Sequence, residues 1–297
     1  MRLSNRLRVA AALPVLLVLA GAAPRAGGDD RPLPDVKAFG AEVRKHLMDE
    51  RALWSRYTYI ERNEEISVSK LGKVQAGPVK VYQVYPSAEP GNTYKKLLSV
   101  DGVPQTPEQL AAQDEKHRED LRRERQKRAR ETPEERAERL RKEEEERQEL
   151  ERTLDEIYVA YDIRLVGRDT IAGRTTVVAV LEPRRRHRPR TDAGKLMKKI
   201  RVRAWVTEDD YQVVRVEGEV IEDVTVGWGL IGRLHKGARG VYERTLVDGE
   251  VWLPSRVTLK GTGRALLLRT FALDTETTYS RYRRIHAGTD DALGAAR

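Results

Sequence analysis

Residues 200–220, IRVRAWVTEDDYQVVRVEGEV, decide the fold of this chain. In the first half Ile200, Val202 and later apolar residues alternate with arginines, and the second half repeats the alternation around Val216. Side chains of a strand point to opposite faces in turn, so each half predicts a strand with one apolar and one polar face. The acidic pair Asp209-Asp210 marks the turn between them. The stretch therefore predicts an antiparallel sheet with one face in water.

Similar runs, rich in valine, tyrosine and threonine, predict strands over most of the chain. They are Trp54–Arg62, Val79–Pro86, Asn92–Val100, Tyr158–Val166, Arg174–Leu181, Val241–Val247 and Val251–Lys260. Asp248-Gly249 between the last two is a strong signal for a two-residue hairpin. Because no helical pattern interrupts the strands after about residue 200, we expect a mainly β (α+β) fold. Its sheet is expected to be a meandering antiparallel one, strongly curved or closed, and not built from βαβ units.

Helical patterns precede and interrupt the strands. Apolar residues at steps of three and four predict an amphipathic helix over Asp35–Leu53. Thr106-Pro107 and Thr132-Pro133 each begin a capping box, which predicts helices over Pro107–Arg130 and Pro133–Glu156 with a break at Pro133. This charged insertion, residues 106–156, interrupts the β domain assigned to residues 35–297.

The inserted helices carry many opposite charges at i,i+4 spacing but few apolar residues. No heptad is sustained, so a coiled-coil dimer lacks its apolar seam. The simplest interpretation is a solvated charged helix that projects from the fold. A partner-docking arm and a lid across a cavity are the alternatives.

Composition excludes several classes of protein. The mean hydropathy of -0.64 leaves no room for repeated membrane spans. The absence of cysteine excludes disulfides, zinc–thiolate sites and thiol nucleophiles. The net charge of +9 is concentrated in residues 184–203, which hold ten basic residues and one acidic residue.

The first 22 residues have the composition of a secretory signal peptide. Arg2, Arg6 and Arg8 precede an apolar run, and Ala20-Gly21-Ala22 fits a cleavage site after Ala22. An uncleaved membrane anchor is the alternative, although the run is short for a span. Residues 23–34 are expected to form a flexible lead-in. We therefore expect a periplasmic or secreted protein.

This order of segments resembles the periplasmic half-barrel proteins of the LolA-like type, with the RseB-like sensors as relatives. The residues that carry the resemblance are 161–174, 200–216, 248–254 and 278–282. The family, commonly described as outer-membrane lipoprotein-sorting proteins, implies a concave apolar sheet that holds acyl chains under a helical lid. It implies no catalytic residues.

A basic loop is the sharpest surface feature. Its residues are Arg184, Arg185, Arg186, Arg188 and Arg190, followed by Lys195, Lys198 and Lys199. Such a cluster attracts anionic lipid headgroups, and the alternative is a mobile solvated loop between strands. A nucleic-acid partner is not expected, because stacking aromatics are missing and the protein is predicted to be exported.

Three other patterns are typical of functional sites, but each lacks a feature that such a site requires. Residues 227–232 match G-x-G-x-x-G but lack the following helix of a dinucleotide site. Ser67-Val68-Ser69-Lys70 has no partner motifs, and the five histidines lack metal-ligand spacing. We expect no catalytic residue, metal or cofactor. Candidates for a ligand cavity or its rim are Trp54, Tyr59, Trp228, Leu230, Ile231, Trp252 and Phe271, and ordinary core or turn packing is the alternative for each.

These patterns together predict a non-enzymatic protein that binds a lipid or acylated protein in an apolar cavity, with its basic loop on an anionic membrane. The alternative is a protein-interaction or envelope-stress sensor module that acts through the charged helices.

Overall fold

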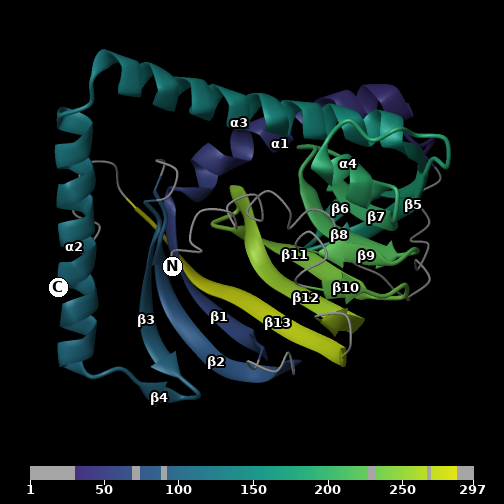
Figure 1. The fold of residues 1–297 in the computed structure, drawn as a ribbon. Helices are drawn as coiled ribbons and strands as arrows, with labels where there is room; N and C mark the ends of the chain where they lie inside the picture. Colours follow the sequence, from purple (N-terminus) through teal and green to yellow (C-terminus); the bar gives the residue numbers. More distant parts are fainter. Residues whose placement is uncertain (1–30, 69–73, 88–91, 227–231, 266–268, 286–297) are drawn as a thin grey trace.

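The computed structural model describes residues 31–68, 74–87, 92–226, 232–265 and 269–285 of the chain (Figure 1). In this part the helices are α1 (Val36–Trp54), α2 (Pro107–Ala129), α3 (Pro133–Ala160) and α4 (Asp192–Met197). The first strands are β1 (Tyr57–Val68), β2 (Val74–Tyr85), β3 (Tyr94–Val100), β4 (Val103–Pro104), β5 (Tyr161–Ile171) and β6 (Arg174–Pro183). The later strands are β7 (Ile200–Thr207), β8 (Val213–Val220), β9 (Val224–Val226), β10 (Gly232–Leu234), β11 (Arg239–Val247), β12 (Val251–Ala265) and β13 (Arg269–Arg284).

The described strands form one 13-stranded antiparallel sheet. Its main path runs β4-β3-β2-β1-β13-β12-β11-β8-β7-β6-β5, with β9 and β10 attached at the side. The mainly β, antiparallel prediction is confirmed. The sheet is open along this path, because β4 and β5 are its two ends.

The connection between those two ends explains the long charged insertion. β4 and β5 are consecutive in sequence but lie at opposite ends of the path, so the chain must cross the whole sheet between them. Ten strand spacings of about 4.8 Å make roughly 48 Å. A helix of 28 residues such as α3 is about 42 Å long. Figure 1 shows α3 running along one end of the sheet and α2 descending beside β3. We call α2 and α3 together, residues 107–160, the strap.

Both ends of the strap are fastened to the fold. Gln113 of α2 donates to the Leu97 carbonyl oxygen at 3.1 Å and accepts from the Leu97 N–H at 2.8 Å, so it completes the hydrogen bonding of β3. At the other end the Tyr158 hydroxyl donates to the Gly40 carbonyl oxygen of α1 at 2.6 Å. Between these ends the strap is solvated: no residue of α2 is buried, and the buried residues of α3 all lie at or beyond Leu154. The prediction of a solvated, projecting helix is therefore wrong for the two ends of the strap, which contact the fold, and right for its middle.

The main core lies on the sheet face that α1 and α4 cover, which we call the inner face. Phe39 and Val43 of α1 and Met197 of α4 pack with Val177 and Val202 of the sheet, and all five are buried. The alternating residues face the opposite side, the outer face. Many of these outer residues are charged and form cross-strand ion pairs, whereas Val178 and Trp205, which alternate with core residues, are buried in a small apolar cluster.

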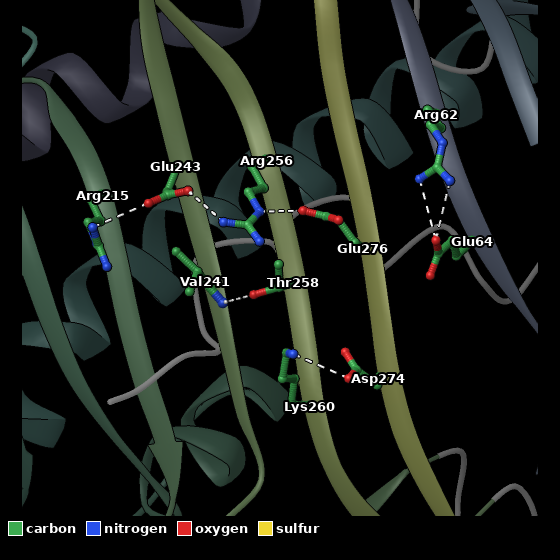
Figure 2. Close-up of polar contacts among 10 residues, drawn as sticks. All are labelled: Arg62, Glu64, Arg215, Val241, Glu243, Arg256, Thr258, Lys260, Asp274 and Glu276. Atoms are coloured by element: carbon green, nitrogen blue, oxygen red, sulfur yellow. Dashed lines mark hydrogen bonds and ion pairs between the residues drawn. The ribbon is translucent and has the colours of Figure 1, made fainter. Parts of the chain in front are cut away.

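Figure 2 shows this ladder on β8, β11, β12 and β13. Glu243 lies 3.3 Å from Arg215 and 3.9 Å from Arg256, which also pairs with Glu276. Each exposed pair contributes at most about 1 kcal/mol. The ladder keeps this part of the outer face in water, as the alternation around Val216 predicts.

Local predictions fared well at helix starts and turns. Both capping boxes are present, at Thr106 and Thr132. Asp248 and Gly249 have φ values of 53° and 72°, which is the left-handed pair that the predicted hairpin requires. The strand expected from Tyr158 is wrong by three residues, because α3 continues to Ala160 and packs there on α1.

Candidate functional site

The basic segment between β6 and β7 is held by one buried carboxylate. Glu156, in the last turns of α3, is 2% exposed. Its Oε1 accepts from the Arg190 N–H at 2.7 Å and lies 2.8 Å from Nε2 of His187. Its Oε2 accepts from the N–H and the hydroxyl of Thr191, at 2.8 and 2.5 Å. The residues 184–190, which we call the arginine loop, are thus tied to the strap.

This arrangement corrects the prediction of a plain loop between strands, because part of the segment is helical. Thr191 caps α4 by accepting from the Gly194 N–H at 2.9 Å. Gly194 faces the Glu156 carboxylate so closely that a Cβ there would lie 2.2 Å from Oε1. The helix α4 and the carboxylate therefore pack directly against each other.

The hydrogen bonds decide the charge state of Glu156. Burial by itself raises the pKa of a carboxyl, but the bonds from Thr191, from the Arg190 N–H and from His187 outweigh it and leave the pKa of Glu156 below its ordinary value of 4.5. At neutral pH the loop is therefore anchored on a negative charge.

The arginine side chains themselves point to solvent. Arg184, Arg185, Arg186, Arg188 and Arg190 are all exposed. Within the described residues none of them forms an ion pair with an acid. The loop thus presents five guanidinium groups that have no acidic partner in the described structure. Its backbone is held in place by Glu156.

The lysines that follow are held differently. Lys195 pairs with Asp192 at 2.6 Å, and Lys199 donates to the Asp223 carbonyl oxygen at 2.7 Å. Lys198 is half-buried. Of the eight predicted basic residues, the five arginines are therefore the ones best placed to meet an anionic surface.

A second feature lies on the inner face and draws its residues from β1, β11 and β13. It is the tyrosine cluster, which consists of Tyr59, Tyr242, Tyr279 and Tyr282. The ring of Tyr59 lies 5.8 Å from that of Tyr279 and 5.4 Å from that of Tyr282. The Tyr282 hydroxyl donates to the Pro254 carbonyl oxygen. In the described part of the chain the hydroxyls of Tyr59 and Tyr279 have no hydrogen-bond partner.

The phenols of Tyr59, Tyr279 and Tyr282 stay protonated at physiological pH, because the pKa of each is raised. Burial first, and then the nearby Glu61 carboxylate, raise the pKa of Tyr59 and of Tyr279 well above 10. Glu61 is itself 4% exposed, and both its oxygens accept from the Lys95 ammonium, at 2.8 and 2.6 Å. The cluster therefore offers uncharged phenol donors beside a carboxylate whose charge is balanced by Lys95.

A buried cation borders the cluster. Arg244 is 6% exposed; its Nε donates to the Tyr242 hydroxyl at 3.2 Å, and another guanidinium nitrogen donates to the Val213 carbonyl oxygen at 2.8 Å. The guanidinium also lies over the ring of Trp54, 5.0 Å from its centroid. Rings, hydroxyls and a fixed positive charge thus meet on one patch.

The structure separates the predicted cavity residues. Trp54 and Tyr59 border or belong to the tyrosine cluster. Trp252, 2% exposed, packs instead with Val178 and Trp205 in a small cluster apart from the main core. Phe271 lies on β13 opposite Gly263. The remaining candidates, Trp228, Leu230 and Ile231, lie outside the described residues.

Three further observations concern metal-ligand groups, membrane-spanning helices and a polar hollow. In the described ranges, no group of His, Cys, Asp or Glu is arranged to hold a metal ion. No helix there combines the length and apolarity needed to cross a membrane. A polar hollow of about 390 Å³ is lined by Arg31, Gly173, Arg174, Thr175, Glu208 and Asp209. Its charges pair with one another, as in the 3.2 Å contact of Arg31 with Glu208.

The sequence patterns did not predict that Glu156 and Arg168 are buried. One indirect signal existed for Glu156: a carboxylate near a helix C-terminus opposes the helix dipole and needs a reason to be there. Arg168 gave no such signal. It holds Glu208 through bonds of 2.6 to 3.1 Å and donates to the carbonyl oxygens of Arg31 and Pro32, so it fixes the chain just before α1.

Comparison with known proteins adds the following. No protein-family model matches the chain, and a search of curated proteins gives no match. A DUF1329 family protein from Desulfovibrio piger has 14% identity and a TM-score of 0.30, over 89% of this chain and 100% of that one. A LolA superfamily protein from Nitrosomonas europaea has 8% identity and a TM-score of 0.28, over 86% and 94%. A Pseudomonas aeruginosa MucA/MucB complex has 12% identity and a TM-score of 0.22, over 84% and 99%.

The LolA-like resemblance predicted from the sequence is thus found again among solved structures. The TM-scores of these matches are low.

Proposed function

We propose that this chain is an exported envelope protein that binds an amphiphile, either a lipid or the acyl chain of a lipoprotein, against its tyrosine cluster. We further propose that it docks on an anionic membrane through the arginine loop. The observation that carries the first part is the pair of inner-face hydroxyls, on Tyr59 and Tyr279, that have no partner within the described residues.

The chemistry of the cluster suits an amphiphile. Tyrosine rings offer apolar contact, and their hydroxyls require a partner when they leave water. Because the phenols stay neutral, they donate hydrogen bonds to ester, carboxylate or phosphate oxygens. Arg244 next to them adds a fixed positive charge. The role is binding and not bond making, since the patch offers donors and rings but no activated nucleophile.

The arginine loop suits a membrane surface. Basic side chains near an anionic bilayer contribute about 1 kcal/mol each. Five exposed arginines would therefore give several kcal/mol, which is enough for reversible docking beside the membrane that supplies or receives the ligand.

Co-purification tests the amphiphile directly. The full chain would be expressed with its leader, purified from the envelope fraction without detergent, and extracted for lipid mass spectrometry. We expect a bound lipid in a reproducible ratio to protein. Protein that carries no lipid and does not bind a dansyl-labelled fatty acid would rule out this function.

A variant locates the site. Tyr59→Phe with Tyr279→Phe keeps both rings and removes both hydroxyls. Two lost hydrogen bonds predict roughly tenfold weaker binding of the dansyl-labelled fatty acid. Tyr85→Phe is the matched control, because the ring of Tyr85 stacks on Tyr94 of β3 and not on the tyrosines of the cluster. An equal effect of the control and the double variant would place the ligand elsewhere.

A second candidate function is protein binding through the strap. The observation that favours it is the solvated middle of the strap, where Leu140 is 49% exposed. This candidate predicts that a photocrosslinking residue at position 140 yields a discrete protein adduct in cells, whereas one at Asp274 on the outer face does not. Diffuse or equal crosslinking at both positions would argue against it.

A further inference from the structure

The arginine loop has little of its own to hold its conformation: its internal backbone hydrogen bond in the described structure runs from the His187 N–H to the Arg184 carbonyl oxygen at 3.0 Å. Five guanidinium groups within seven residues repel one another, and no acid on the surface of the described chain pairs with them. Such a segment is expected to be extended and mobile unless something fixes its backbone. The described loop is nevertheless fixed, and its anchor comes from a different element, the strap.

Burying the Glu156 carboxylate costs free energy, so we expect this anchor to have a functional role. Glu156 is nearly fully buried, and burying a carboxylate is unfavourable unless hydrogen bonds compensate. It also lies in the C-terminal turns of α3, where the helix dipole disfavours negative charge. An apolar side chain would avoid both costs and would fill the same space. Only an acceptor, however, satisfies the donors of the loop.

The donors require a carboxylate and not an amide. Both N–H groups and the Thr191 hydroxyl converge on the two oxygens, with donors on each. An amide would replace one oxygen by an NH₂ group, which would then face an N–H donor. Because the backbone donors point inward to Glu156, the arginine side chains are left to point outward.

We propose that Glu156 is the positioning residue of the membrane-docking site: it latches the arginine loop so that its five guanidinium groups face the bilayer together. This inference rests on the membrane docking proposed above, and it assigns that surface a residue that does not touch the membrane. A preorganised loop loses less conformational freedom on binding than a mobile one.

For Glu156→Gln, the latch and simple electrostatic attraction predict opposite changes in the affinity for an anionic membrane. Glu156→Gln makes the chain more positive by one charge, so attraction to an anionic surface alone would strengthen binding. Loss of the latch weakens binding, because the loop must be ordered again on the membrane. Glu149→Gln is the matched control: Glu149 lies on the same helix, is half exposed and, among the residues that the structure describes, pairs only with neighbouring Arg152 at 3.1 Å.

Vesicle sedimentation measures the effect. The full chain and both variants are titrated with vesicles of phosphatidylglycerol and phosphatidylcholine, and with phosphatidylcholine alone. We expect Glu156→Gln to bind the anionic vesicles about tenfold more weakly than wild type, and Glu149→Gln to bind them equally or more tightly. None should bind phosphatidylcholine alone. If Glu156→Gln bound as tightly as Glu149→Gln, the latch would be refuted.

A second variant covers the case in which Glu156→Gln does not fold. Thr191→Val keeps the shape and the net charge, and removes the hydroxyl that donates to Glu156 and caps α4. Weaker anionic binding is again expected. An unchanged affinity would count against the latch.

Hydrogen exchange of residues 184–194 separates the latch from the docking function. We expect faster exchange there in Glu156→Gln and Thr191→Val but not in Glu149→Gln. If wild type does not bind anionic vesicles, the docking function fails, and exchange alone then decides whether Glu156 fixes the loop. Unchanged exchange in both latch variants would overturn the inference whatever the binding result.

Discussion

Gly194→Ala tests how tightly α4 packs on Glu156. A Cβ at position 194 would lie 2.2 Å from Oε1, 2.3 Å from Cδ and 2.5 Å from Oε2 of Glu156. These distances are about 1 Å inside normal van der Waals contact. The carboxylate is the flexible end of its side chain, but it cannot move aside without leaving the hydrogen bonds that hold it.

The expected magnitude follows from two opposing effects. Alanine in place of glycine within a helix stabilises by about 1 kcal/mol when there is room for the methyl group. Overpacking costs about 1–3 kcal/mol, and each hydrogen bond lost from a charged group costs about 1.5 kcal/mol or more. Two or more of the four bonds to Glu156 would be broken, at a cost of about 3 kcal/mol, which exceeds the helix gain of about 1 kcal/mol even before overpacking is added. We therefore expect Gly194→Ala to lower the free energy of unfolding by at least about 2 kcal/mol.

Urea unfolding followed by tryptophan fluorescence measures this difference. The same substitution in a Glu156→Ala background provides the control, because the clash is then absent and the helix-propensity gain should appear. The two backgrounds form a double-mutant cycle whose interaction term reports the packing of the two residues. A Gly194→Ala protein as stable as wild type, or more stable, would refute the close packing of α4 on Glu156.

Three further results are expected. Arg168→Met should lower the free energy of unfolding by about 2 kcal/mol, because it removes the buried guanidinium that bonds Glu208 and the carbonyl oxygens of Arg31 and Pro32, while Glu208 keeps its contact with Arg31; a loss under about 1 kcal/mol in urea unfolding would contradict this. Gln113→Ala should speed hydrogen exchange across α2, because Leu97 loses both bonds; unchanged exchange would show that the strap is held otherwise. The low pKa of Glu156 adds stability above pH 4.5, which is lost as the pH falls through the lower folded-state value. Urea midpoints of Glu156→Gln should therefore depend less on pH in that acid range than those of wild type, and parallel curves would contradict the assignment.

Much of the local structure could be predicted because its causes are local. The capping boxes at Thr106 and Thr132, the hairpin at Asp248-Gly249 and the alternation around residue 200 each depend on a few neighbouring residues. The hairpin at Ala172-Gly173 carries a weaker signal in the sequence, although both residues have positive φ values, 49° and 77°. Alanine is rarely found in that conformation, so the sequence pattern understates the turn.

The candidate site was predictable only in part. The arginine loop was found because a run of like charge is visible in sequence. Its anchor was missed, because Glu156 is one of many acids on a charged helix and nothing local marks it as buried. The tyrosine cluster was missed for a similar reason: Tyr59 and Tyr279 are 220 positions apart and meet only when β1 pairs with β13.

The sequence by itself determined the type of most elements, the starts of the first three helices, the hairpin at Asp248-Gly249 and the places where charge gathers. These depend on side-chain period, caps and turns within a few residues. Only the tertiary structure decided that β4 and β5 lie at opposite ends of one sheet, so that the charged helices must cross it as a strap. The same crossing brings the last turns of α3 against the arginine loop, where long-range packing converts one surface-type glutamate into a buried anchor.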